Sequence, residues 1–115
     1  MATDRQAGQR SEVLQGTLEM LALKLLTAEP MHGWGLSLKL RLISRDVFDV
    51  NQGSLYPALQ RMLIKGWISG EWGKTEGNRR ARYYRLTPAG RKQLAREMEG
   101  YDRVARAIAR ILQPA

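Results

Sequence analysis

The sequence predicts a mostly α-helical domain that carries one β-hairpin. Three short segments repeat apolar residues in steps of three and four, which is the spacing of a helix with one buried face. Two segments rich in aromatic and aliphatic residues follow, separated by the polar connection GKTEGNRR, a pattern typical of a hairpin. A long segment with helical periodicity ends the chain. We therefore predict a winged helix-turn-helix fold, with three helices, a hairpin wing and a long C-terminal helix.

The first two helices are predicted from leucine spacing. The first should cover about residues 14 to 28 and end at Glu29-Pro30. Its apolar face is marked by Leu14, Leu18, Leu21 and Leu25. The second follows MHG, continues through Leu36, Leu40 and Ile43, and should stop near residues 44–46.

The third helix is predicted between a capping residue and a glycine stop. Asn51 is a favourable N-cap and Gly66 suits the C-terminal end. The buried face is predicted to contain Leu55, Leu59, Met62 and Leu63. Pro57 removes one backbone donor if Asn51 is the cap, but lies in the free first turn if Ser54 is the cap. The sequence leaves both caps open.

The hairpin strands are expected at 67–72 and 81–86, and Thr87-Pro88 should start a helix that reaches about Leu112. Apolar residues of this helix are spaced 4, 3, 4, 3 and 4, a repeat of 3.5 that is typical of a coiled-coil seam. The predicted dimer interface consists of Leu94, Met98, Tyr101, Ala105, Ile108 and Leu112. Part of this face could instead lie on the domain's own core, and we expect some of each.

Length and composition bound the class of protein. With 115 residues the chain suits one domain, and its formal net charge of +8 favours a polyanionic partner. The absence of cysteine excludes disulfides and thiol chemistry. We expect a disordered tail at 1–12, a winged helix-turn-helix domain at 13–87 and a dimerisation helix at 88–113. Because no segment reads as a signal peptide or a membrane span, we also expect a cytoplasmic protein without membrane contact.

Two features indicate nucleic acid as that partner. From Gly77 to Arg96 the chain has seven basic residues and no acidic one, so the hairpin loop, second strand and last helix start are basic together. A solvated charged face is the ordinary alternative. If the leucines of helix three are buried, the opposite face should carry small or hydrogen-bonding residues that fit a major groove. Those residues are Gly53, Ser54, Pro57, Gln60 and Arg61, with Tyr56 at the edge of the core.

Enzyme signatures are weak. His32 is the only histidine and is expected to cap or pack at the start of helix two. Gly33 and Gly35 begin a G-x-G pattern, but Leu38 stands where a dinucleotide fingerprint needs its third glycine. Trp67 is expected in the core. We therefore predict no enzyme activity, no metal site and no cofactor.

Four segments together resemble the PadR family of transcriptional regulators. They are PMHGWGLSLKL (30 to 40), GSLYPALQRM (53 to 62), KGWI (65 to 68) and NRRARYYRLTPAGRKQL (78 to 94). The resemblance covers about residues 14 to 112. It implies a dimeric repressor that binds a pseudo-palindromic operator in double-stranded DNA.

The resemblance also implies roles for particular residues. The DNA-binding residues would be Gln52, Ser54, Tyr56, Pro57, Gln60, Arg61, Arg79 and Arg80. Members of similar size bind flat aromatic compounds at the dimer centre, and the matching residues here are Tyr101 and Met98, which would favour an aromatic or phenolic effector. Two alternatives stay open, a protein-interaction module that binds no DNA and an RNA-binding protein.

Overall fold

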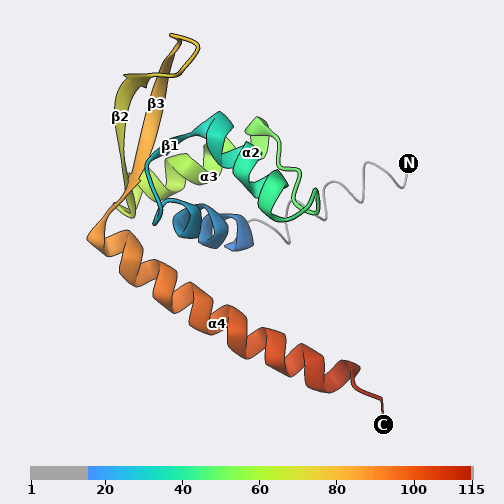
Figure 1. Ribbon diagram of the computed structural model, residues 1–115. Coiled ribbons are helices and arrows are strands. Elements are labelled where there is room, and N and C mark those ends of the chain that lie inside the picture. Colours follow the sequence, from blue (N-terminus) through green and yellow to red (C-terminus); the bar gives the residue numbers. More distant parts are fainter. Residues whose placement is uncertain (1–15, 115) are drawn as a thin grey trace.

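The computed structural model describes residues 16–114 (Figure 1). The first helix, drawn in blue, covers 16–25 within this range, and it is followed by strand β1 (Met31–His32), helix α2 (Gly33–Ile43) and helix α3 (Gln52–Ile64). Strands β2 (Ile68–Lys74) and β3 (Arg80–Leu86) form the hairpin, and α4 (Pro88–Leu112) ends the chain. The predicted winged helix-turn-helix fold with its long C-terminal helix is confirmed. The predicted tail at 1–12 and Leu14 lie outside the described residues.

Leucine and methionine side chains from the three short helices form the core. Leu23, Leu36, Leu55, Leu59 and Met62 are its largest fully buried members. Three of these five belong to α3, as its apolar spacing predicted. Burying one such side chain stabilises the fold by about 1.5–3 kcal/mol, so α3 is held mainly by this one face.

The sheet has the strand order β1-β3-β2, with both pairs antiparallel. In β2 and β3, Ile68 pairs with Leu86 at the base and Lys74 pairs with Arg80 near the tip. Strand β1 adds only two pairs, Met31 with Tyr84 and His32 with Tyr83. The sequence did not reveal β1, because two residues carry no periodicity.

The helix caps settle two points that the sequence left open. Asn51 is the cap of α3, because its Oδ1 accepts a hydrogen bond from the N–H of Ser54 at 2.9 Å. Pro57 therefore lies inside the helix, where it cannot donate to the carbonyl of Gly53 four residues earlier. His32 caps α2, as expected, and its Nδ1 accepts a hydrogen bond from the Gly35 N–H at 3.1 Å.

The start of α4 is fixed to the end of α3 and the base of the hairpin. The Thr87 hydroxyl donates to the carbonyl of Gly66 at 2.6 Å, and the Thr87 N–H donates to the carbonyl of Trp67 at 3.1 Å. The same hydroxyl accepts from the N–H of Gly90 at 3.0 Å and so caps the helix. A Cβ at position 90 would collide with the carbonyl oxygen of Trp67, so this close approach requires glycine.

Helix α4 begins against the domain and then extends beyond it (Figure 1). Leu94 is only 7% exposed and belongs to the core, whereas Met98 is 44% exposed and Ile108 is 50% exposed. Leu94 is thus in the part of this face that lies on the domain's own core, which was one of the two placements expected from the sequence. The first turns of α4 bury their apolar residue within the domain, and the apolar residues further along the helix have no cover within the described chain.

Candidate nucleic-acid interface

The outward face of α3 is a narrow, uncharged surface. Its exposed residues follow each other at helical spacing, at Gly53, Tyr56, Pro57, Gln60 and Ile64. This face begins at the N-terminus of the helix, where backbone N–H groups are free of intrahelical partners. Such a surface can approach the edge of a nucleic-acid base or a phosphate closely. The structure thus places Pro57 and Gln60 where the sequence predicted them.

Tyr56 combines packing with exposure. Its ring lies against Gly33 at the start of α2, since a Cβ on that glycine would come within 3.0 Å of the tyrosine oxygen. The residue is nevertheless 49% exposed. Tyr56 therefore packs against α2 and at the same time contributes to the exposed surface of α3.

Gln52 is turned toward α2. Its Nε2 donates a hydrogen bond to Ser37 Oγ at 3.0 Å, and Ser37 in turn donates to the carbonyl of Trp34 at 3.0 Å. The side chain is therefore occupied in joining the N-terminal ends of two helices, and is only half exposed. Gln52 thus has a structural role, because a residue in the first turn of α3 lies beside the buried Ser37; its contact with DNA stays a prediction.

Arg61 is half-buried at the edge of this face and pairs with the first helix, and its predicted contact with DNA stays a prediction. Its Nε donates to Oε1 of Glu19 at 3.0 Å, which joins α3 to the first helix. The Glu19 side chain is 10% exposed and that of Arg61 is 34% exposed. Arg61 is next to the buried Met62 in the sequence. Its partner Glu19 lies on another helix, so the spacing of residues in α3 could not reveal the pair.

A cluster of ionisable groups surrounds this ion pair. Burial raises the pKa of the Glu97 carboxyl above its usual value, while the hydrogen bond from Gln93 lowers it, Glu19 raises it and Lys65 lowers it. The Glu97 carboxyl on α4 is thus influenced by charges of the first helix and of Lys65 at the end of α3.

Burial also raises the pKa of the Tyr84 hydroxyl in the core.

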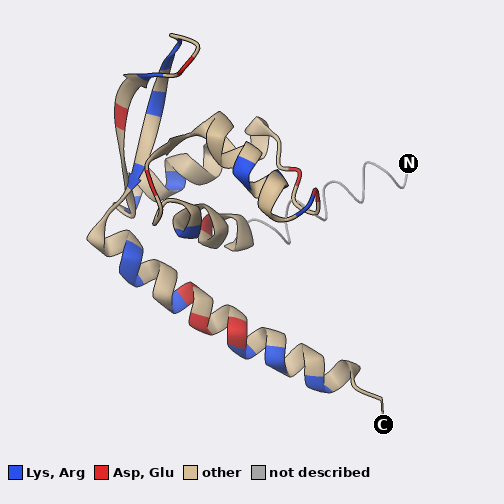
Figure 2. Cartoon of the chain, viewed as in Figure 1, with Lys and Arg blue, Asp and Glu red and all other residues tan. Residues whose placement is uncertain are grey.

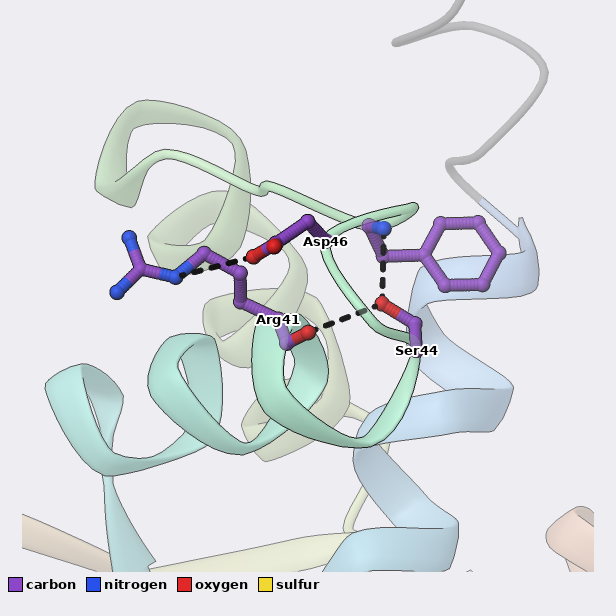
Figure 3. A network of polar contacts seen from close by, with 4 residues as sticks. Arg41, Ser44 and Asp46 are labelled. Carbon is purple, nitrogen blue, oxygen red and sulfur yellow. Dashed lines mark hydrogen bonds and ion pairs between the residues drawn. The ribbon is translucent and has the colours of Figure 1, made fainter.

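The turn between α2 and α3 has a defined polar structure (Figure 3). Ser44 Oγ donates to the carbonyl of Arg41 at 3.4 Å and accepts from the N–H of Phe48 at 2.9 Å. Arg41 also pairs with Asp46 across 3.8 Å. Arg45 and Asp46 adopt φ angles of 54° and 68°, in the left-handed region that such residues enter only in turns. These contacts hold the sharp change of direction between the two helices.

The hairpin extends away from the helices as a basic wing (Figure 1). Arg79 and Arg80 are exposed, as predicted, and the guanidinium carbon of Arg80 lies 4.5 Å from the centre of the Trp72 ring. Figure 2 shows Lys and Arg along β3, with acidic residues on β2 and at the loop. The wing therefore presents positive charge on a hairpin whose strand β2 contacts α3.

Apart from Tyr56 and Ile64 on α3 and Trp72 on β2, the exposed large apolar side chains of the described residues form two groups. Those of α4 include Met98, Tyr101, Val104, Ile108, Ile111 and Leu112. A second group lies on α2 and the turn after it, and comprises Trp34, Leu38, Leu42, Ile43 and Val47. The second group was not predicted, although its first three members are spaced four residues apart in the sequence.

The described chain offers no sign of a metal site or a membrane span. Between residues 16 and 114 no three His, Asp or Glu side chains are grouped so that they could hold a metal ion. None of the helices in this range is both long enough and apolar enough to cross a membrane.

A supported helix with a polar outward face beside a basic hairpin defines a winged helix-turn-helix protein. Residues 22–96 match the model of the Transcriptional regulator PadR-like family. The chain belongs to this family, which confirms the resemblance drawn from its motifs, and the protein is thus a transcriptional regulator.

Individual relatives agree with this assignment. The chain is 36% identical over 78 residues to the transcriptional regulator Rv3488 of Mycobacterium tuberculosis, covering 68% of this chain and 69% of the relative. The structure of a PadR-like transcriptional regulator from Bacillus cereus is 29% identical, with a TM-score of 0.77 over 90% of this chain and 99% of that one. A PadR-family regulator from Eggerthella lenta is 26% identical, with a TM-score of 0.76 over 100% and 99% of the two chains.

Proposed function

We propose that the protein is a homodimeric repressor that binds double-stranded DNA in a sequence-specific manner. The observation that carries this proposal is that α3 buries one side in the core and exposes an uncharged side, while the hairpin that contacts this helix is basic. A helix that presents small side chains at its N-terminus can enter a major groove, where its side chains meet base edges. The wing then supplies cations to the phosphates.

Within this interface we assign different roles to the exposed residues. Gln60 is the residue suited to base reading, because an amide can pair with two atoms of adenine. The tyrosine hydroxyl of Tyr56 and the N-terminal region around Ser54 suit phosphate contacts, while Pro57 keeps the surface narrow. Gln52 and Arg61 act from within the protein by holding α3 in place.

A dimer through α4 is supported by the apolar residues that this helix leaves exposed. From Met98 onward they recur along one side of the helix, and an isolated apolar surface of this kind in a soluble domain usually marks an interface. A twofold dimer would bind a pseudo-palindrome with half-sites about one turn, or 10 to 11 base pairs, apart. Occupation of such an operator would exclude the transcription machinery and repress the gene.

The salt dependence of binding tests the DNA interface. If two wings and two α3 helices neutralise about 6 to 10 phosphates, a plot of log K against log salt concentration should have a slope of about −6 to −9. Fluorescence anisotropy with a labelled duplex measures this slope. A slope near zero would rule out the phosphate contacts on which the proposal depends.

The dimer is tested by Ile108→Glu. This change would bury a carboxylate against apolar groups at a cost of several kcal/mol, so the dimer should dissociate in analytical ultracentrifugation. Arg110→Glu is the matched control, because position 110 lies on the side of α4 away from Ile108 and should leave the dimer intact. If Ile108→Glu sediments as a stable dimer, the pairing surface lies elsewhere.

We further propose that an aromatic or phenolic effector binds at the dimer centre and releases DNA. Tyr101 is 59% exposed on the same side of α4 as Met98, so two symmetry-related rings could flank a flat ligand. Such a ligand releases DNA only if it binds the DNA-incompetent state more tightly. Phenolic compounds that bind the wild type and dissociate its DNA should bind Tyr101→Ala more weakly by calorimetry. Equal affinity for both proteins, or binding without DNA release, would contradict this role.

A further inference from the structure

The two faces of the hairpin differ in chemistry. Trp72 lies opposite Arg82, and Lys74 lies opposite Arg80. Opposite residues and every second residue of a strand share a face, so these four side chains lie on the same side of the hairpin. At its base the same face carries the buried residues Ile68 and Tyr84, and is therefore turned toward the helices.

Trp72 is not a core residue. It is 62% exposed, although a tryptophan usually contributes far more of its surface to packing. One side of its ring is covered by Arg80, whose guanidinium carbon is 4.5 Å from the ring centre. Contacts of this geometry attract a cation to the ring and restrict its rotamers. The Trp72 ring thus contacts the Arg80 guanidinium and does not pack in the core.

Arg82 on the same face is also held against the strands. Its side chain lies over Gly70, where a Cβ would collide with the guanidinium. The nearest acidic residue in β2, Glu71, points to the opposite face by strand alternation. The face of Trp72 therefore gathers Lys74, Arg80 and Arg82 without a carboxylate from either strand.

We propose that Trp72 is a positioning residue that holds Arg80 extended for a phosphate contact. This inference rests on the proposed DNA-binding function and refines it. An arginine already fixed in its bound geometry loses less conformational entropy when it meets a phosphate. Arg79 lies in the loop before β3 and has no ring contact among the described residues, so its contribution to affinity is smaller than that of Arg80.

A double-mutant cycle tests the dependence of Trp72 on Arg80. The probe is a fluorescein-labelled, mixed-sequence DNA duplex at low salt, and the readout is the dissociation constant from anisotropy. Trp72→Ala should weaken binding by roughly three- to tenfold, because it frees the arginine. In the Arg80→Gln background the same change should have less than about a twofold effect, since the two residues act as one unit.

Three variants serve as controls. Trp72→Phe keeps an aromatic face and should restore most of the affinity, while Trp34→Ala removes an equally exposed tryptophan from α2 and should leave affinity unchanged. Arg79→Gln should weaken binding less than Arg80→Gln. Thermal melting should be similar for all variants, because these side chains lie outside the core.

The possible outcomes separate the inference from the function on which it rests. If Trp72→Ala leaves affinity unchanged, or has the same effect with and without Arg80, the positioning role is overturned while DNA binding stands. If the wild type fails to bind any duplex, the proposed function fails and the inference falls with it.

Discussion

The burial of one side of α3 is the constraint on which the rest of the molecule depends. Leu55, Leu59 and Met62 are almost completely removed from solvent, and apolar burial of this size outweighs any single polar contact of the helix. When one side of a helix is buried, the residues on its opposite side must face solvent. The position of Gln60 on the surface is thus a consequence of the core.

Apolar contact alone does not fix the rotation and tilt of a helix, because it has little direction. Two polar links supply this direction, from Gln52 to Ser37 at one end of α3 and from Arg61 to Glu19 further along. Hydrogen bonds of this kind add modest net stability, but leaving either partner buried alone is costly. The links therefore penalise alternative placements of α3 more than they stabilise the present one.

The same helix is joined directly to α4. Gly66 and Trp67 follow the end of α3, and both of their carbonyls accept hydrogen bonds from Thr87 at the start of α4. A shift of the long helices in a dimer would therefore move the end of α3 as well. This connection gives the proposed effector a physical route to the DNA-reading surface.

The sequence predicted the elements that are defined by the periodicity of apolar residues. It did not predict side-chain contacts between segments that are far apart in the chain. The helices, the hairpin and the long last helix follow from local spacing, whereas the choice of Asn51 over Ser54 as the cap of α3 required the structure. Local spacing could not reveal the bond of Arg61 to Glu19, forty-two residues earlier, or that of Gln52 to Ser37 on another helix. Leu94 has the same spacing as the other apolar residues of α4, and only the structure shows that it packs in the core.

The central claim is that the outward face of α3 reads DNA sequence, and selection of bound duplexes from a random library tests it most directly. Wild type should select a pseudo-palindromic motif, and Gln60→Ala should relax the preferred base at one position of each half-site. Arg61→Lys, which keeps a cation near Glu19, should retain the wild-type motif. Selection of no motif, a motif unchanged by Gln60→Ala, or a motif altered by Arg61→Lys would contradict this account.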